Sequence, residues 1–493
     1  MRKALCAFLF LVALAFFCRA HTAIEIGGDE GMELQKARLL ATQPDKVSQM
    51  WNDQPLLYTV LSAKLFKAFG MSPAIPRLLT LIAVFVCLLQ LPQLITVEVS
   101  SIRWLATALL LLTWPNILNL VPVGMCEVPA FCTACAACAL ILTGLKSAER
   151  YKLWCGAILL AVGIHWKLTA LIVLPALALA VATVNCEKKQ VILGSSVFVC
   201  ATIVLWMILP PMSFDMLLGS HAQAGEALRQ SASQFGKWEP RWLADNPAHL
   251  LLAGYGLFQI WRRNPRDAAF PLTLLITALA IHSFHRPWWW YYSIHFAVPF
   301  ALLGGMGVEG LLRALTEPGA RQPEERDSPI LQNARFRAIL GCTLTISLWL
   351  GFNVPQTFKQ VAAVRRGSTH DSELVARLRE LQPRTKWAYS PRGLAYLFAA
   401  NMNVPPELVI LSDKRFLSGH LTDEHLISII LRYRPDVLLL SLPPEQGPTS
   451  WPTFVTDNYT LTYQDAAFYL YEKSAPSAVA NVTTAGTLRR MGL

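Results

Sequence analysis

Residues 51–79 read WNDQPLLYTVLSAKLFKAFGMSPAIPRLL and lead directly into a long apolar run. From Leu57 to Phe69, apolar residues recur at four-residue spacing, which predicts a helix with one apolar face, and Lys64 and Lys67 lie off that face. Such a helix lies in the surface of a membrane rather than across it. It either anchors the chain there or forms the wall of a lipid-headgroup site, with its lysines attracting phosphate.

The apolar run after this helix is one of eleven. Of 493 residues, 54% are hydrophobic and 15% are charged, and the mean hydropathy is +0.40. Because soluble domains carry about 25% charged residues, a purely soluble enzyme is excluded. Helices of about 20 apolar residues cross a bilayer. We predict spans near residues 4–20, 76–95, 103–119, 128–145, 152–164, 168–184, 191–211, 247–261, 269–283, 291–312 and 337–353.

The formal net charge of +11 follows from topology, so we expect no nucleic-acid partner. If the N-terminus is cytoplasmic, the inner connections are rich in lysine and arginine, whereas the short outer turns hold only Lys167 and Arg286. The positive-inside rule favours this orientation. We expect a retained first span rather than a cleaved signal peptide, a cytoplasmic N-terminus and an extracytoplasmic C-terminus.

An odd number of spans places loop 21–74, loop 212–246 and the C-terminal region outside. Residues 1–353 would form the membrane domain, whose outer loop 21–74 carries an acidic motif, and residues 354–493 a small separate domain. In this domain, TKWAYS, ELVIL, DVLLLS and AFYLYEK alternate as short strands around a helix at Thr422–Tyr433. The predicted fold class is mainly α: a polytopic transmembrane helical bundle of about 11 spans with a small α/β extracytoplasmic C-terminal domain.

Eight ionisable residues fall at outer helix ends or in outer loops. Such groups often only reach from a helix end into the interface, but their common side favours a shared site. They are Asp29, Glu30, Asp53, Glu127, Lys167, His282, His285 and Arg286.

The acidic pair Asp29-Glu30 follows the first span directly, in GGDEGMELQKARLL. A carboxylate at this position can accept a proton from a hydroxyl group or coordinate a cation. Alternatively, Asp29 only caps the helix that follows.

Taken together, these motifs resemble the glycosyltransferases of the C-type fold. The resemblance rests on Asp-Glu after the first helix, the PLLYxxL…FGxS…R segment from Pro55 to Arg77, an acidic residue that opens the fourth span and a basic residue between the fifth and sixth spans. The nearest group resembles family 39, which includes dolichyl-phosphate-mannose protein mannosyltransferases and lipid A aminoarabinose transferases. The resemblance is most specific between Gly27 and Arg77 and weakens after Leu312.

The resemblance implies an integral membrane enzyme of the bacterial inner membrane that moves a hexose or pentose from a polyprenyl-phosphate-linked sugar to an extracytoplasmic acceptor. Asp29, with its neighbour Glu30, matches the acidic residue of the first loop that is proposed as the base, and Glu127 matches the second acidic position. Lys167 and Arg286 match basic residues. They would bind the donor phosphate, whose negative charge grows as the glycosidic bond breaks.

Four further residues are expected to line the substrate cavity: Asp53, Tyr58, His282 and His285. Where the family has a basic residue before two prolines, this chain has Asp53-Gln54-Pro55, so a basic contact is missing there. The two histidines raise the possibility of a divalent metal. However, two histidines three residues apart are weak evidence, and we expect no metal and no other cofactor.

Two features leave alternatives open. The aromatic run from Trp288 to Tyr292 either anchors its helix at the interface or lines the path of an isoprenoid chain. For function, the main alternative is a transporter or lipid flippase, which would place charged residues near the bilayer midplane and show paired half-sequences. A non-catalytic assembly or sensor protein is the third possibility. The sugar and the acceptor are not specified by the sequence.

Overall fold

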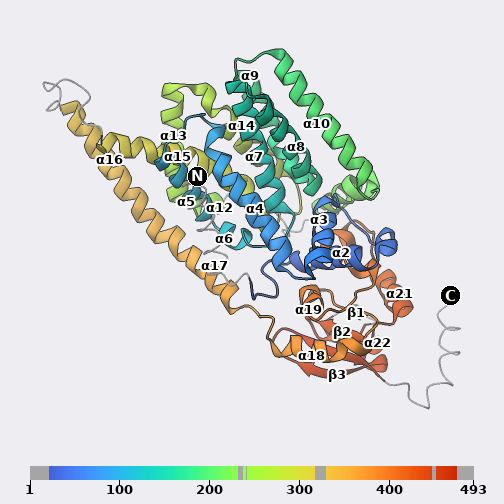
Figure 1. Cartoon of the computed structure of the whole chain (residues 1–493). Helices are drawn as coiled ribbons and strands as arrows, with labels where there is room; N and C mark the ends of the chain where they lie inside the picture. The colour runs from blue at the N-terminus through green and yellow to red at the C-terminus, as the bar shows by residue number, and fades with distance from the viewer. Residues whose placement is uncertain (1–20, 231–236, 240, 317–328, 447–450, 475–493) are drawn as a thin grey trace.

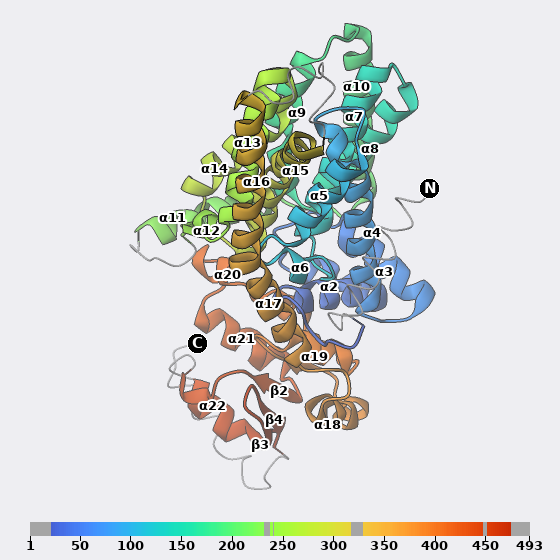
Figure 2. The ribbon, with the colours of Figure 1, turned by 90° about the vertical axis from the view of Figure 1, so that its left-hand side faces the viewer.

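The computed structural model describes residues 21–230, 237–239, 241–316, 329–446 and 451–474. A long bundle of helices stands above a smaller module that contains a sheet, and the helical segment α16–α17 runs down the side of the bundle into that module (Figures 1 and 2). The predicted first span, 4–20, lies outside the described residues. The structure therefore places the bundle and the C-terminal module end to end.

The bundle is built by helices that run back and forth between its two ends. They are α4 (Ala74–Gln90), α5 (Ser101–Leu112), α7 (Glu127–Ser147), α8 (Arg150–Trp166), α9 (Leu174–Thr183), α10 (Lys188–Ile208), α13 (Pro247–Arg263), α14 (Ala269–Phe284), α15 (Ile294–Thr316) and α16 (Pro329–Leu348). Short helices α6 (Ile117–Leu120), α11 (Ser220–Gln230) and α12 (Arg241–Ala244) and the 3-10 turns η2 (Leu91–Leu94), η3 (Leu168–Val173), η5 (Pro265–Ala268) and η6 (Trp290–Ser293) join them.

Helices α7 and α10 occupy opposite environments. In the most apolar stretch of α7, 94% of the residues are buried, whereas the figure for α10 is 6%. The alanines and cysteines of α7 let its neighbours approach closely: a Cβ at Gly156 of α8 would lie 2.8 Å from the Ala137 carbonyl oxygen. Cys132, Cys135 and Cys138 of α7 are among these buried packing residues, whereas α10 leaves most of its side chains exposed, as a helix that faces lipid would.

Among the described residues, six helical segments are long and apolar enough to cross a membrane, and the number eleven is not confirmed. The six are Ala74–Leu94, Glu127–Ser147, Lys188–Ile208, Pro265–Phe284, Trp290–Thr316 and Phe336–Arg366. The runs at 101–112 and 168–183 form shorter apolar helices, and α8 and α13 have 17 residues each. The chain is thus a multi-pass membrane protein, and several of the predicted spans form helices shorter than the length that crosses a bilayer.

The first loop forms helices α2 (Glu30–Thr42) and α3 (Leu57–Phe69), joined through η1 (Pro44–Gln49). The predicted amphipathic helix is α3. Its buried side is formed by Tyr58, Thr59, Ser62, Ala63 and Phe66, while the side chains at the predicted apolar stripe are half-buried or, at Phe69, exposed. The apolar stripe is therefore only partly free for a membrane surface: Leu57 and Leu61 pack against the core of the bundle, and Phe69 is exposed.

The C-terminal module contains a four-stranded sheet in the order β1-β2-β4-β3, with strands β1 (Ala388–Tyr389), β2 (Val437–Leu440), β3 (Tyr459–Gln464) and β4 (Tyr469–Lys473). The first two strands are parallel and the other pairs antiparallel. Helices α18 (Glu373–Leu381), α19 (Leu394–Ala399), α20 (Asp413–Leu417), α21 (Asp423–Tyr433) and α22 (Trp451–Asn458) and the turns η9 (Gln382–Arg384), η10 (Pro406–Leu408) and η11 (Pro444–Gln446) complete it. The expected α/β character and the helix ending at Tyr433 are both found.

One expectation about this module was wrong, and one strand was not predicted. ELVIL (407–411) is not a strand: its first residues form the turn η10 after two prolines, which remove backbone donors from a possible ladder. YTLTYQ (459–464) is a strand, although its side chains are largely exposed, because it pairs as an edge with β4.

The predicted domain boundary falls inside a continuous helical segment. From α16, the chain passes through the π-helical turn η8 (Trp349–Asn353) into α17 (Val354–Arg366). Just beyond, Thr369 forms an isolated bridge with Ala23. Residue 354 is therefore a point within a helix, and the module begins after Arg366.

The first loop packs into the C-terminal module. Leu39, Met50, Trp51 and Leu56 belong to the same buried apolar cluster as the strands β1, β2 and β4. Helix α2 also lies directly against α19: a Cβ at Gly31 would lie 2.6 Å from the Ala395 backbone nitrogen, so only glycine permits this approach. Loop 21–74 thus lies between the bundle and the module and contacts both.

Candidate active site

Two cavities meet at the end of the bundle that faces the C-terminal module. The first, which we call the charged cavity, encloses about 440 Å³ between α2, the segment 289–291 and residues 391–414. The second, the apolar cavity, encloses about 340 Å³ between η3, α14 and the segment 217–221. Asp53 and Gln54 line both. The two spaces therefore adjoin at the segment that lacks the family's basic residue.

Asp29 lines the charged cavity. It occupies the N-cap position of α2, but its side chain makes no capping hydrogen bond. Burial raises the pKa of Asp29 above its ordinary value, although the ammonium groups of Lys167 and Lys414 and a hydrogen bond from Tyr291 act in the opposite direction. The carboxylate is therefore directed at the cavity and its cations, and the capping interpretation fails.

Glu30 has different surroundings. It is fully buried, and Arg77 of α4 donates to both of its oxygens, from Nε at 2.8 Å and from Nη2 at 2.7 Å. The backbone nitrogens of Gly124 and Ile26 add hydrogen bonds of 2.8 and 2.9 Å. Every contact of Glu30 is thus internal.

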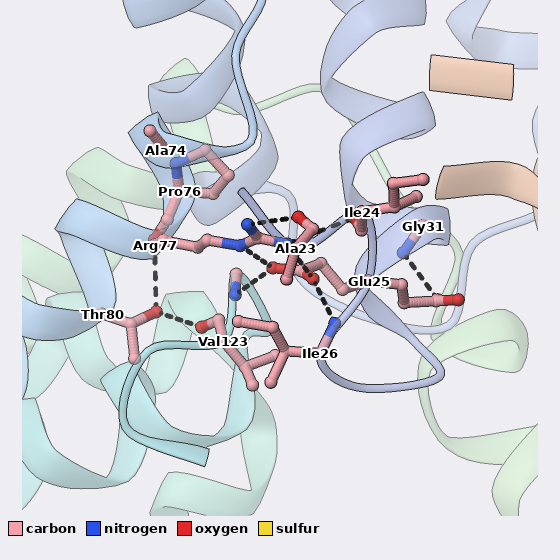
Figure 3. Close-up of polar contacts among 12 residues, drawn as sticks. Ala23, Ile24, Glu25, Ile26, Gly31, Ala74, Pro76, Arg77, Thr80 and Val123 are labelled. Carbon is pink, nitrogen blue, oxygen red and sulfur yellow. Dashed lines mark hydrogen bonds and ion pairs between the residues drawn. The ribbon is translucent and has the colours of Figure 1, made fainter. Parts of the chain in front are cut away.

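Figure 3 shows Arg77 extending from α4 to the chain at Ala23 and Ile24, whose carbonyl oxygens accept further hydrogen bonds at 2.8 and 3.2 Å. Beside it, Thr80 donates to the Val123 carbonyl at 2.7 Å. Arg77 therefore joins the start of the first loop to α4, and the Glu30–Arg77 pair holds the loop in place.

Glu127 begins α7 and holds Lys167, which follows the end of α8. Its Oε2 lies 3.0 Å from Lys167 Nζ, and Thr169 donates to Oε1 at 2.8 Å. His295 of α15 places Nε2 2.9 Å from the same oxygen. Glu127 is fully buried and lines neither cavity, so it positions the lysine.

Lys167 lines the apolar cavity and lies against the ring of Tyr291, which lines the charged cavity. Its Nζ lies 4.8 Å from the centre of the Tyr291 ring, and Tyr291 is the hydrogen-bonding neighbour of Asp29. An ammonium at this junction can hold the phosphate of a ligand whose tail occupies the apolar cavity.

Asp53 is paired with residues that sequence reasoning missed. Lys414 of α20 donates to its Oδ2, and His221 Nε2 lies 3.4 Å from the same oxygen. Burial opposes ionisation of Asp53, yet Lys414 and His221 outweigh it and hold the pKa of this carboxyl well below its usual range. An ionised Asp53 therefore separates the two cavities.

The predicted histidines His282 and His285 both line the apolar cavity. His282 Nε2 lies 2.9 Å from His295 Nδ1, so the chain of contacts runs from His282 through His295 to Glu127. In the part of the chain that the structure describes, no group of three histidine, cysteine, aspartate or glutamate side chains is arranged to hold a metal ion.

Two of the predicted site residues lie elsewhere. Tyr58 is buried beneath α3, where its hydroxyl donates to the Pro76 carbonyl at 3.0 Å, so it lines neither cavity. Arg286 also lines neither, and its carbonyl oxygen faces Gly225 of α11. Tyr58 is a packing residue because it lies on the buried side of α3, within the apolar core of the bundle.

The aromatic run lines the cavities. Trp289, Trp290 and Tyr291 line the charged cavity, and Tyr292 lines the apolar one. The side chains of Tyr291 and Tyr292 are buried, which an interfacial anchor would not be.

Of the residues that were missed, His295 had a sequence signal. It stands at the start of a predicted span on the outer side, the criterion that selected His282 and His285. Lys414 and His221 had none, because nothing in the order of the chain links the second loop and the C-terminal module to Asp53.

Comparison with known proteins shows the fold. No protein-family model and no curated protein sequence matches the chain. Among solved structures, ArnT from Cupriavidus metallidurans bound to undecaprenyl phosphate is similar with a TM-score of 0.62 and 13% sequence identity, over 95% of this chain and 98% of that one. The apo oligosaccharyltransferase from Archaeoglobus fulgidus has a TM-score of 0.59 and 10% identity, over 97% of this chain and 75% of that one.

The archaeal oligosaccharyltransferase AglB, in complex with an inhibitory peptide and a dolichol-phosphate, is similar at a TM-score of 0.56 and 11% identity. These structural similarities extend over nearly the whole chain, including the C-terminal module. The predicted C-type glycosyltransferase fold is confirmed.

Proposed function

We propose that the protein is an integral membrane glycosyltransferase that moves a sugar from a polyprenyl-phosphate donor to an extracytoplasmic acceptor. The observation that carries the proposal is the junction of the two cavities: a carboxylate, Asp29, lines one, a held ammonium, Lys167, lines the other, and Asp53 lies at the boundary. The solved structures of ArnT with undecaprenyl phosphate and of AglB with a dolichol-phosphate support a lipid phosphate as the ligand.

In this proposal, the donor's isoprenoid chain enters the apolar cavity and its phosphate stops at Lys167. Leu168, Leu171, Ile172 and Ile281 supply an apolar lining for the chain. Glu127, Thr169 and His295 fix the position of the ammonium before the donor arrives, so little reorganisation is needed when charge develops on the leaving phosphate.

The acceptor occupies the charged cavity, and Asp29 is its base. The acceptor hydroxyl gives its proton to the Asp29 carboxylate as its oxygen bonds to the anomeric carbon. The bond between that carbon and the phosphate oxygen breaks, and polyprenyl phosphate leaves with the electron pair. A raised pKa brings Asp29 closer to the pH at which it works, which favours proton transfer.

Glu30 was also a candidate catalytic residue, and we assign the base to Asp29 instead. Both Glu30 oxygens are engaged by Arg77 and backbone amides, whereas Asp29 lines the cavity. Arg286 was a candidate phosphate ligand, but it lines neither cavity. The second cation beside the junction is Lys414, which lines the charged cavity and pairs with Asp53.

A transporter is less well supported. The site residues lie at helix ends, with Glu127 at the start of α7, Lys167 after α8 and His295 near the start of α15, and not near the middle of the bundle. A transport site between two halves needs ligands at mid-depth.

Release of polyprenyl phosphate is the test. The purified full-length protein is incubated with a panel of polyprenyl-phosphate hexoses and pentoses, with and without candidate acceptors, and the released lipid phosphate is quantified. We expect turnover with at least one donor, and the same rate after EDTA treatment because we propose no metal in the reaction. Folded protein that releases no lipid phosphate from any donor, while moving labelled lipid across vesicles, would favour the flippase.

A further inference from the structure

Lys414 is a buried cation that the C-terminal module inserts into the membrane domain's site. It belongs to α20, and its side chain is 9% exposed. Asp53 of the first loop is its ion-pair partner, and His221 of α11 lies 3.2 Å from its Nζ. Three segments far apart in the sequence therefore meet at one ammonium group.

The position of Lys414 relates it to the site and not only to domain packing. It lines the charged cavity, and its partner Asp53 lines both cavities. The positive charges of Lys414 and Lys167 both lower the pKa of Asp29, so both ammonium groups lie near enough to act on the same carboxylate. Each also has its own buried acidic partner, Asp53 for Lys414 and Glu127 for Lys167.

This arrangement supplies what the sequence of the first loop lacks. The segment Asp53-Gln54-Pro55 has no basic side chain, so it cannot itself neutralise the donor phosphate, whose single negative charge is joined by a second as polyprenyl phosphate leaves. A single ammonium at Lys167, already paired with Glu127, leaves such a group under-compensated. A second ammonium beside the junction can add another charge-assisted contact to the phosphate when its pairing with Asp53 is exchanged for the ligand.

Resting on the proposed function, we propose that Lys414 is a phosphate-binding residue of the donor site, held in place by Asp53 and His221 until the donor phosphate becomes its partner. The C-terminal module is then part of the donor site, because it contributes a residue that touches the leaving group. Donor recognition depends on both domains being docked.

Lipid binding with and without a phosphate separates this role from a structural one. The probes are undecaprenyl phosphate and undecaprenol, each titrated against the full-length protein in bilayer discs. For Lys414→Met we expect binding of undecaprenyl phosphate to weaken about 10- to 100-fold, the loss of one charge-assisted contact, and binding of undecaprenol to stay within about twofold. Lys414→Arg should restore most of the phosphate affinity.

Substitution of Asp53 should change the affinity for undecaprenyl phosphate in the opposite direction. Asp53→Asn removes the competitor of the phosphate for Lys414, so undecaprenyl phosphate should bind as tightly as to the parent protein or more tightly. If Lys414 only docks the module, the two substitutions break the same ion pair and should act in the same direction on both lipids. The double variant D53N/K414M leaves no unpaired buried charge and should still lose the affinity for undecaprenyl phosphate. It therefore tests the inference even if the Lys414→Met protein does not fold.

Arg432→Met is the matched control. Arg432 is a basic residue of the same module, paired with Glu407 at 2.9 Å and lining neither cavity, so its loss should leave both lipids unaffected. Equal undecaprenyl phosphate binding by K414M and parent would overturn the inference and leave the proposed function intact. A parent protein that binds no undecaprenyl phosphate and releases lipid phosphate from no donor would overturn both.

Discussion

Asp29 and Glu30 are adjacent in the chain, yet one lines a cavity and the other is enclosed by Arg77 and backbone amides. Their adjacency was visible in the sequence, and Asp29 was correctly placed at the start of a helix. The sequence did not show which residue pairs with each carboxylate. Arg77, for example, is the last residue of the Pro55–Arg77 segment, but nothing in the sequence indicated that it binds Glu30. Pairing of buried charges depends on helix packing, which a linear pattern does not contain.

Asp29→Asn should lower the rate of sugar transfer by about 10²–10⁴-fold while leaving the affinity for the donor nearly unchanged. Asparagine keeps the size of the side chain but cannot accept the acceptor's proton. Lys167→Ala should lower both the rate of transfer and the affinity for the donor, because a cation holds the phosphate before and during the reaction. Single-turnover rates and lipid-binding titrations measure the two quantities separately. Near-normal turnover of Asp29→Asn at saturating substrates would rule out its role as base.

Glu25 lines the charged cavity, and burial, together with the charge of Glu30, raises its pKa to about 8 from an ordinary 4.5. Between these two values the folded protein holds a proton that the unfolded chain releases, so this group lowers stability as the pH rises. Glu25→Gln cannot ionise. The difference in melting temperature between Glu25→Gln and the parent protein should therefore shift in favour of the variant between pH 5 and pH 8.

Glu380→Gln is the control for this pH effect, since Glu380 is a largely exposed residue of α18. It should shift the melting temperature equally at both pH values. A difference between Glu25→Gln and parent that stays constant with pH would show that Glu25 is ionised in the folded protein.

At the scale of elements, the Glu30–Arg77 pair joins the first loop to α4, and Gly31 allows α2 to lie against α19. These two contacts fix the N-terminal end of α2. The end of this helix carries Asp29, so errors in its placement would move the base within the cavity.

Arg77→Met should destabilise the protein by about 3–5 kcal/mol, because it leaves the Glu30 carboxylate buried without a counter-charge. Thermal unfolding in detergent measures the loss. The double variant R77M/E30Q removes both charges and should recover much of the stability. A Glu30→Gln protein with parental stability and no turnover would instead mark Glu30 as a residue of the reaction.

The helices of the bundle could be predicted because a helix that crosses a bilayer needs a long apolar run, which is visible in the sequence. Ten of the expected spans correspond to helices among the described residues, although several are short. The strands were less predictable: β3 exposes most of its residues, and ELVIL has a strand's composition but follows prolines. Strand formation in the C-terminal module depends on pairing with β4, which local composition does not reveal.

For the whole molecule, topology is the first prediction to check. The N-terminus should be cytoplasmic and residues 354–493 extracytoplasmic, because basic residues concentrate in the inner connections. Reporter fusions after Leu493 that are active only outside the cytoplasm would agree. A cytoplasmic signal there would place the site on the wrong face for an extracytoplasmic acceptor.

At this scale the sequence predicted an appendage, and the structure has an integrated module. Asp29, Asp53 and Lys167 could be chosen as candidates because they lie in or near the motifs of the sequence. Lys414 was not, since it approaches Asp53 across 361 positions of the chain. Long-range contacts of this kind arise from domain docking, and one sequence without aligned relatives holds no trace of them.

The shared apolar cluster of the first loop and the C-terminal module has a consequence for biosynthesis. Leu39, Met50, Trp51 and Leu56 leave the ribosome early, but the strands that cover them are made last. These side chains therefore stay uncovered by the module while the entire bundle is inserted. A nascent chain stopped at residue 366 should have a protease-sensitive first loop that becomes resistant only in the full-length protein. In the proposed function, the donor site would therefore be complete only after the last domain has been made.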